Sequence, residues 1–361
     1  MNASTAAQAA AATSAASIAA AASASAPAEP HRPAATMQAV VQRRYAEPEA
    51  MTLETVERPE PAADEVLIEV RAAGVDRGQW HLVTGHPMIM RLMGFGFRRP
   101  SNPTPGNEVS GVVVGVGAEV TRFSLGDEVF GVTDSGYAEY AVAKERALVT
   151  KPADLGFAEA ATVIQSALPA QIAVDDIAKV SAGQRVLVLG ASGGVGSFAV
   201  QLAKAAGATV AAVGSAAKAD LMRDLGADTV IAYETTDVTT EDATYDAIID
   251  IGGRLPVYRL RRILAPEGTL VIVGGEGGGT VTGGIGRQLR AAALNPFIRQ
   301  TLAFFVSQPS PENIARLRER LVAGDFRSAV TRTYPLAEAP AAVADIAAGR
   351  IAGKAAVVVR D

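Results

Sequence analysis

Apolar and polar residues alternate in short runs along the first part of the chain, and turn residues separate these runs. Such a pattern indicates β-strands. Gly126-Asp127 and Asp134-Ser135-Gly136 supply turns. We therefore predict a β-rich domain with a partial barrel. Its expected strands are Met37–Val41, Glu65–Ala73, Glu108–Val116, Glu128–Gly131 and Ala138–Val142.

From about residue 155 the pattern changes, because helical periodicity now alternates with short apolar runs. This alternation is typical of βαβ units and a parallel sheet. The last part of the chain, Phe326–Leu336 and Ala355–Val359, is strand-like again, and we expect it to rejoin the first domain. The fold class is therefore α/β with two domains. The strands expected in the parallel sheet are Arg185–Leu189, Thr209–Val213, Thr229–Ile231, Ala247–Ile251 and Thr269–Val273.

Residues 1–36 are rich in Ala, Ser and Thr, and no Lys or Arg comes before Arg32. A secretory signal needs a basic start and a mitochondrial transit peptide is rich in Arg, so neither is indicated. The segment has no periodic apolar face, and we predict a disordered extension. Because no long unbroken apolar run follows, we expect no integral membrane span and a cytoplasmic location.

The strongest local motif is the sequence RVLVLGASGGVG, which starts at Arg185. An apolar strand enters a glycine-rich turn, and a helix begins there. Gly193 and Gly194 allow a pyrophosphate to approach the backbone, and Gly196 allows close packing of helix on strand. The helix N-terminus directs free N–H groups at the phosphates. The pattern is A-x-G-x-x-G, since Ala191 holds the first glycine position, and it predicts a dinucleotide site.

The end of the second parallel strand indicates which dinucleotide binds. An NAD site places Asp or Glu there to bind the ribose hydroxyls. The sequence instead reads Val213-Gly214-Ser215-Ala216-Ala217-Lys218. The Ser215 hydroxyl and the Lys218 ammonium suit a 2′-phosphate, so we predict NADP(H) rather than NAD(H). The alternative for Lys218 is an ordinary solvated lysine on a helix.

Composition excludes several other functions. The chain has 361 residues, with 33 Lys and Arg against 38 Asp and Glu, so no basic excess indicates nucleic-acid binding. It has no Cys, which excludes disulfides, a Cys nucleophile and a thiolate zinc site. The three His residues, His31, His81 and His86, all lie in the first quarter of the chain.

Several motifs spread over residues 37–361 resemble one family. They include RAAGVDRGQWHLVTGHP at 71–87, GVVVGVGAEVTRFSLGDEVFGV at 111–132, GASGGVG at 190–196 and AGKAAVVV at 352–359. The chain resembles a zinc-independent medium-chain dehydrogenase/reductase of the quinone oxidoreductase type. The resemblance implies a GroES-like catalytic domain (37–160 and 307–361) and a Rossmann domain (161–306). It also implies a homodimer that pairs an edge strand at Leu302–Val306.

The resemblance also implies the site residues. In zinc-dependent members, Cys and His stand where this chain has Asp76 and Asn107, so we expect no metal. An oxygen and nitrogen set of Asp76, His81 and Glu108 is the alternative, with Glu108 otherwise a structural carboxylate. Asp76, His81 and Asn107 are the catalytic candidates, and His81 is either a general acid or a hydrogen-bonded structural residue. The residues implied for the cofactor are Ser192, Gly193, Gly194 and Val195 at the pyrophosphate, Ser215, Lys218 and Tyr233 at the 2′-phosphate, Gly274 at the nicotinamide, and Gly353 and Lys354 from the last loop.

The predicted function is an NADPH-dependent oxidoreductase that delivers hydride to a small molecule, a quinone or an α,β-unsaturated carbonyl. Two alternatives remain: an NADPH-binding regulatory or adaptor protein with little turnover, and a free-standing enoyl reductase. The glycine-rich run Gly274–Gly286 is interpreted as a flap over the substrate or as an irregular loop. The apolar stretch Ile285–Val306 that follows lines a substrate pocket, touches a membrane surface or supplies the edge strand.

Overall fold

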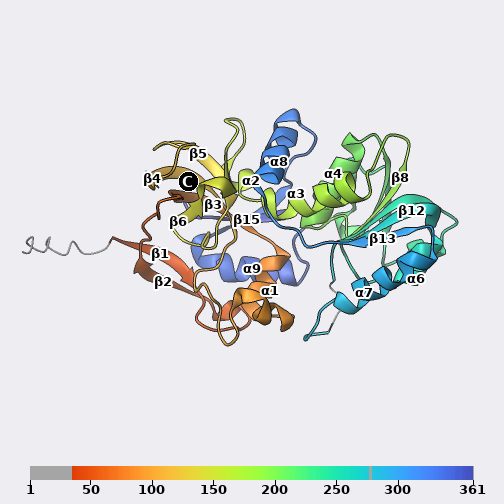
Figure 1. Cartoon of the computed structure of the whole chain (residues 1–361), viewed down its shortest axis with the longest axis horizontal. Helices are drawn as coiled ribbons and strands as arrows, with labels where there is room; N and C mark the ends of the chain where they lie inside the picture. The colour runs from red at the N-terminus through yellow and green to blue at the C-terminus, as the bar shows by residue number, and fades with distance from the viewer. Residues whose placement is uncertain (1–34, 276–278, 361) are drawn as a thin grey trace, which may run out of the picture. The chain divides into compact units, whose positions relative to one another are not determined.

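The computed structural model describes residues 35–275 and 279–360 (Figure 1). The predicted extension at 1–36 therefore lies outside the described residues, apart from its last two. Of these, Thr36 already belongs to strand β1 (Thr36–Val41), so the folded chain begins one residue before the predicted start. Contacts group the described residues from Thr36 onward into one unit.

The two ends of the folded chain share one sheet, as predicted. Its strands run in the order β14-β15-β3-β4-β5-β7, and β6 pairs with β3. The C-terminal strand β15 lies antiparallel to β3, with Ala356 opposite Gly74. Strand β1 pairs with β2 (Thr52–Glu57) in a separate hairpin. The bounds in the shared sheet are β3 (Glu65–Val75), β4 (Glu108–Val116), β5 (Glu128–Val132), β6 (Tyr140–Lys144), β7 (Leu148–Thr150), β14 (Val330–Pro335) and β15 (Lys354–Val358).

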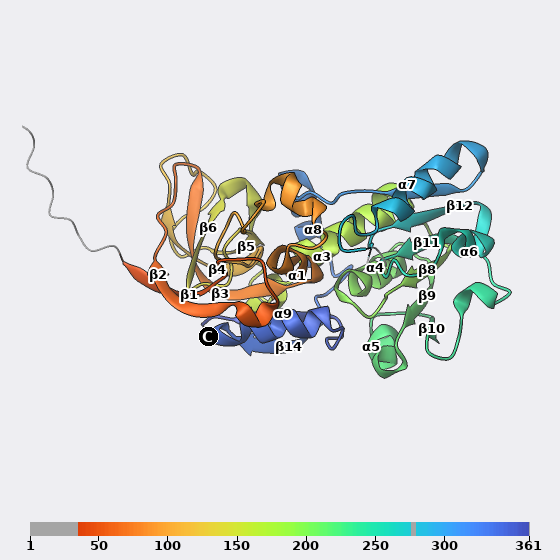
Figure 2. The same ribbon diagram turned by 90° about the horizontal axis from the view of Figure 1, so that it is seen from below.

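The middle of the chain forms a parallel sheet in the order β10-β9-β8-β11-β12-β13 (Figure 2). Alternate residues of each strand face opposite sides, so that Val188 packs in one core cluster and Leu187 in another. The strands are β8 (Arg185–Leu189), β9 (Thr209–Gly214), β10 (Thr229–Ala232), β11 (Tyr245–Asp250), β12 (Leu264–Ile272) and β13 (Thr301–Phe304).

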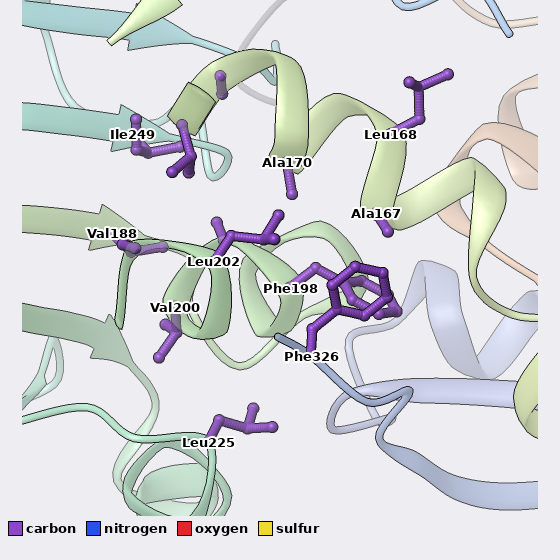
Figure 3. Packing of buried hydrophobic residues seen from close by; sticks show 14 of the residues in the cluster. Ala167, Leu168, Ala170, Val188, Phe198, Val200, Leu202, Leu225, Ile249 and Phe326 are labelled. Carbon is purple, nitrogen blue, oxygen red and sulfur yellow. The ribbon is translucent and has the colours of Figure 1, made fainter. Parts of the chain in front are cut away.

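The helices are α1 (Arg77–Thr84), α2 (Phe157–Ala160), α3 (Ile164–Gln171), α4 (Gly194–Ala205), α5 (Ala219–Asp224), α6 (Val257–Arg262), α7 (Ile285–Leu294), α8 (Pro311–Ala323) and α9 (Ala339–Ala347). Helix α4 is central to the first core cluster, where Leu202 lies between the parallel strands and α3, and Phe198 points toward Phe326 (Figure 3). The rings of Phe198 and Phe326 meet edge to face, with centroids 5.3 Å apart. This packing fixes the start of α4, where the glycine-rich turn lies.

Most strand predictions are confirmed, and Glu108–Val116 and Arg185–Leu189 agree at both ends. The prediction of a strand from Phe326 is wrong for its first four residues. The side chain of Gln201 forms hydrogen bonds with both backbone groups of Arg327. Its Oε1 accepts the Arg327 N–H at 3.0 Å, and its Nε2 donates to the Arg327 carbonyl at 3.0 Å. Those groups are therefore not free to pair with a neighbouring strand.

The predicted strand Ala138–Val142 is also displaced, since β6 spans Tyr140–Lys144. Ala138 forms an isolated bridge with Ala39 of β1 instead, so the backbone turns from one sheet to the other at this point. Strand β2 is missed because its side chains are polar or exposed along most of its length.

Candidate active site

The glycine-rich turn lies at the carboxyl end of β8 and leads into α4. Gly190 has a φ of +82°, and the N–H groups of Gly190 and Ala191 both donate to the Val213 carbonyl at 3.0 Å. A Cβ on Gly196 would lie 2.1 Å from the Gly190 carbonyl oxygen, whereas one on Gly193 would meet only that atom, at 3.4 Å. Gly196 is therefore required by helix-on-strand packing, and Gly193 borders open space at the helix N-terminus.

The last loop of the chain closes against this turn. The Gly353 N–H donates to the Ser192 carbonyl at 2.8 Å. Lys354 is almost fully buried, and its Nζ donates to Ser166 Oγ on α3 at 2.7 Å. A Cβ on Gly194 would lie 3.0 Å from Ser166 Oγ. The structure thus brings Ser192, Gly194, Gly353 and Lys354 together, and half-buried Val195 packs behind them on the core.

The ends of β9 and β10 lie side by side. Lys218 is half-buried, and its Nζ donates to the carbonyls of Gly349 at 2.8 Å and Ile351 at 2.7 Å. Burial lowers the pKa of Lys218. Ser215 precedes it, and Tyr233, at the end of β10, is exposed. Lys218 is thus a bridge to the chain after α9 rather than a freely solvated lysine.

Sequence reasoning missed an acid at this point. The Glu234 carboxylate accepts the Ala216 N–H at 3.1 Å, so it lies beside the predicted 2′-phosphate position. The signal was available, since Glu234 lies two residues after the end of β10 and β10 neighbours β9 in the sheet. The end of β9 has no acid of its own, but the Glu234 carboxylate places a negative charge next to it.

Gly274 lies at the carboxyl end of β12. Its N–H donates to the Asp250 carbonyl at 3.2 Å, and a Cβ would lie 2.0 Å from the Ile251 carbonyl oxygen. Close approach of two strand ends therefore requires glycine. The interpretation of Gly274–Gly286 as a flap concerns residues 276–278 too, and those lie outside the described residues. Beyond them, the carbonyls of Thr280 and Val281 accept the N–H groups of Met88 and Ile89.

The three catalytic candidates lie around the start of α1 and of β4. Asp76 caps α1, with Oδ1 accepting the Gln79 N–H at 3.0 Å, and its buried Oδ2 has no hydrogen-bond partner within the described chain. The buried Oδ1 of Asn107 also lacks one there. His81 is held differently, because its Nδ1 lies 2.7 Å from the His86 carbonyl oxygen. Gln79 Oε1 accepts the Gly106 N–H, which ties α1 to the loop before Asn107.

Glu108 is the most perturbed group of the site. It is fully buried; Oε1 accepts the Gln165 N–H at 3.2 Å, while Oε2 has no partner among the residues described. Burial raises the pKa of Glu108 to about 8. The positive charge of Lys354 opposes this shift, and the negative charge of Asp76 adds to it. Glu108 was expected to be a structural carboxylate, and Ser166 was not singled out. No local pattern links these residues: the close approach of Gly74 to Glu108 Oε2, 2.7 Å from an added Cβ, is seen only in the fold.

Two cavities flank this region. One, of about 230 Å³, is lined by Gln79, Phe95, Gly106 and Asn107 among others. A larger one, of about 630 Å³, lies between the β1–β2 hairpin and the segments around Thr133 and Val142, and contains none of the predicted site residues. The smaller cavity therefore borders the predicted chemistry. In the part of the chain that the structure describes, no group of three or more His, Cys, Asp or Glu is placed to hold a metal ion, so the set of Asp76, His81 and Glu108 is not supported.

Comparisons with known proteins show which family has this fold. Residues 62–153 match the family model described as the alcohol dehydrogenase GroES-like domain, and residues 225–357 match the one described as zinc-binding dehydrogenase. The chain is 31% identical over 329 residues to the mouse mitochondrial NAD(P)H oxidoreductase RTN4IP1, covering 81% of each protein. It belongs to the zinc-independent medium-chain dehydrogenase/reductases of the quinone oxidoreductase type. This family assignment makes the protein an NAD(P)H-dependent oxidoreductase.

Two solved structures show the same fold. The quinone oxidoreductase from Coxiella burnetii matches with a TM-score of 0.78 at 26% identity, over 90% of this chain and all of that one. A mycobacterial protein complexed with NADPH matches with a TM-score of 0.75 at 25% identity, over 90% of this chain and 100% of that one. The GroES-like domain and the Rossmann-type parallel sheet are thus those of the family.

The residues present fit a nicotinamide dinucleotide. The open space at Gly193, at the start of α4, suits a pyrophosphate. The carboxyl ends of β8, β9, β11 and β12 lie at one edge of the parallel sheet, where ligands of such sheets bind.

Proposed function

We propose that the protein is an NADPH-dependent oxidoreductase that reduces a quinone or an α,β-unsaturated carbonyl. The observation that carries the choice of NADPH is the end of β9, where Ser215 and Lys218 stand and the strand ends without a carboxylate of its own. A related mycobacterial structure complexed with NADPH supports the same choice. NADPH, when bound, supplies a hydride to the acceptor, and a conjugated acceptor delocalises the charge that results.

Each part of the site then has one task. Ser192, Gly193, Gly194 and Val195 hold the pyrophosphate at the N-terminus of α4. Ser215, Lys218 and Tyr233 surround the 2′-phosphate. In this proposal Gly274, Gly353 and Lys354 orient the nicotinamide half against the acceptor, which is the main contribution of the protein to the rate.

The reduction is complete only when a proton follows the hydride. Asp76, His81 and Asn107 are the proposed catalytic candidates, with water as the alternative source of the proton. His81 as the general acid is tested by His81→Ala, because unchanged turnover would remove it from the mechanism. Of the three candidates, Asn107 is the one that lines the cavity of about 230 Å³.

The proposal is tested by following NADPH oxidation with quinones, 2-alkenals and enones, with NADH as the comparison. We expect turnover with at least one acceptor class and tighter binding of NADPH than of NADH. Tight NADPH binding without turnover across the panel would favour the regulatory alternative. Activity confined to enoyl thioesters would favour the enoyl reductase alternative.

We further propose a homodimer and a cytoplasmic location. The outer edge of β13 is unpaired within the described chain, and Phe304 on it is partly exposed, so a second copy can extend the sheet. No helix in the described residues is long and apolar enough to cross a membrane. Light scattering after size exclusion tests the dimer, and fractionation of the source cells tests the location.

A further inference from the structure

One segment beside the smaller cavity has an unusual charge. Residues 77–107 contain four Arg and no Asp or Glu, in a chain whose formal net charge is −5. The same segment exposes large apolar side chains: Met88 is 47% exposed, Leu92 73%, Phe95 42% and Phe97 67%. Neither Arg98 nor Arg99, both exposed, has an ion-pair partner in the described parts of the chain. Contiguous exposed apolar residues of this size mark an interaction surface.

Contacts of Tyr45 and Arg91 fix the backbone of this exposed segment. The Tyr45 hydroxyl donates to the carbonyls of Phe95 at 2.7 Å and Gly96 at 2.6 Å. The guanidinium of Arg91 lies over the Tyr45 ring, 4.3 Å from its centroid, and its Nε donates to the Gly85 carbonyl at 2.9 Å. Tyr45 and Arg91 therefore hold the backbone of this segment in place, while the side chains of Phe97, Arg98 and Arg99 are exposed.

A second segment of the same character lies next to the first. The Met88 N–H donates to the Thr280 carbonyl at 2.9 Å, and the Ile89 N–H donates to the Val281 carbonyl at 3.1 Å. Residues 279–311 contain three Arg and no acid, and Val281 and Leu289 are both 59% exposed. Helix α7 and the chain that follows α1 lie along the same lower edge in Figure 1.

We propose that these two segments form one surface that binds the anionic headgroup layer of a lipid bilayer. We call it the cleft-mouth surface. Its aromatic and aliphatic side chains enter the boundary between headgroups and acyl chains, and its arginines pair with lipid phosphates. The excess of acids elsewhere in the chain is repelled by an anionic membrane, so the charge distribution favours this face toward the lipid, although Asp134 lies at the cavity beside it. The residues of the cleft-mouth surface are Met88, Leu92, Phe95, Phe97, Arg98, Arg99, Val281, Leu289 and Arg290.

The position of the surface links it to the site. Gly94 and Phe95 line the cavity of about 230 Å³ that also touches Asn107 and Gln79. A lipid-soluble acceptor would pass from the bilayer to Asn107 without crossing bulk water. This consequence rests on the proposed function, whereas binding to lipid does not.

The experiment is co-sedimentation of the full chain with vesicles, with no substrate or cofactor present. We expect binding to vesicles rich in phosphatidylglycerol, weak binding to pure phosphatidylcholine, and release at high salt. Arg98→Gln/Arg99→Gln should weaken binding to anionic vesicles about tenfold or more. Leu92→Ser/Phe97→Ser should weaken it by a similar factor and leave a residual, fully salt-sensitive attraction.

Matched variants elsewhere on the surface are the controls. Arg146→Gln/Arg262→Gln removes the same charge from exposed positions, and Leu125→Ser/Tyr258→Ser removes exposed apolar area. Both should bind vesicles like the unchanged protein. Absence of binding to anionic vesicles at low salt, or equal losses in the controls, would overturn the proposal. So would a change of oligomeric state in Leu92→Ser/Phe97→Ser without lipid, because a second copy would then be what covers this surface.

Discussion

The two halves of the candidate active site differ in whether backbone or side chains form them. The half that would hold the dinucleotide consists mainly of backbone: a glycine turn, the start of α4 and the carboxyl ends of parallel strands. The half around Asn107 consists mainly of polar side chains, with Glu108 fully buried beside it. Backbone N–H groups can bind a ligand without any buried charge in the protein. Burying ionisable side chains in the other half costs folding free energy. Substitutions in the two halves should therefore fail in different ways.

Gly196→Ala should have the largest effect. The added Cβ would meet the Gly190 carbonyl oxygen, which is backbone and cannot rotate away. We expect a loss of about 3 kcal/mol or more in the free energy of unfolding, together with loss of NADPH binding. Gly193→Ala is the matched control, since its Cβ has room; it should unfold within about 0.5 kcal/mol of the unchanged protein yet bind NADPH about tenfold more weakly. Similar unfolding of both variants would contradict the distinction. Denaturant titration and fluorescence titration measure the two quantities.

Glu108→Gln tests the side-chain half. The pKa of Glu108 is raised from 4.5 to about 8 in the folded state, so the folded protein holds a proton that the unfolded chain releases between these values. The stability that this proton contributes is fully present below about pH 4.5 and is lost as the pH rises through about 8. Glu108→Gln should remove this dependence of stability on pH between about 4.5 and 8. Unfolding at a series of pH values measures it, and Glu119→Gln, at an exposed site, is the control. An unchanged pH profile would show that Glu108 is ionised in the folded state.

Lys218→Met tests whether Lys218 binds the 2′-phosphate in addition to its structural contacts. In the structure Lys218 binds the carbonyls of Gly349 and Ile351. If it also contacts the 2′-phosphate, the Kd for NADPH should rise about tenfold while that for NADH stays constant. Equal weakening of both would leave Lys218 with the structural role alone. Lys204→Met, which breaks a partly exposed ion pair with Asp228, should change neither.

Glu234→Gln should have the smallest effect. Its carboxylate lies at the Ala216 N–H, beside the proposed 2′-phosphate position, and is well exposed. Removing one exposed negative charge should tighten NADPH binding about threefold and leave NADH binding unchanged. Isothermal titration at low and high salt measures the difference, which should shrink at high salt. Weaker NADPH binding in this variant would place the phosphate elsewhere.

The same contrast explains what the sequence could predict. Arg185–Leu189 and the glycines after it are contiguous, so their spacing alone predicted the strand, the turn and the helix start. The contact of Lys354 with Ser166 joins residues 188 positions apart, and no local pattern indicates it. The strand predicted at Phe326 failed for the same reason, because Gln201, on a distant helix, binds the backbone of Arg327. The exposed side chains from Leu92 to Arg99 also have no periodicity that would have marked them.

The order of the shared sheet has a consequence for synthesis on the ribosome. Strand β15 lies between β14 and β3, and β6 covers only Glu65–Glu69 of β3, so residues 72–75 of β3 stay unpaired on that side until β15 has emerged. The parallel sheet, whose strands all precede β14, can assemble first, since domains made early in translation fold as units. Lys354 arrives with β15, so one late event both seals an aggregation-prone edge and delivers a buried cation to the cofactor side. Premature termination near residue 350 should therefore yield an insoluble chain rather than a slow enzyme.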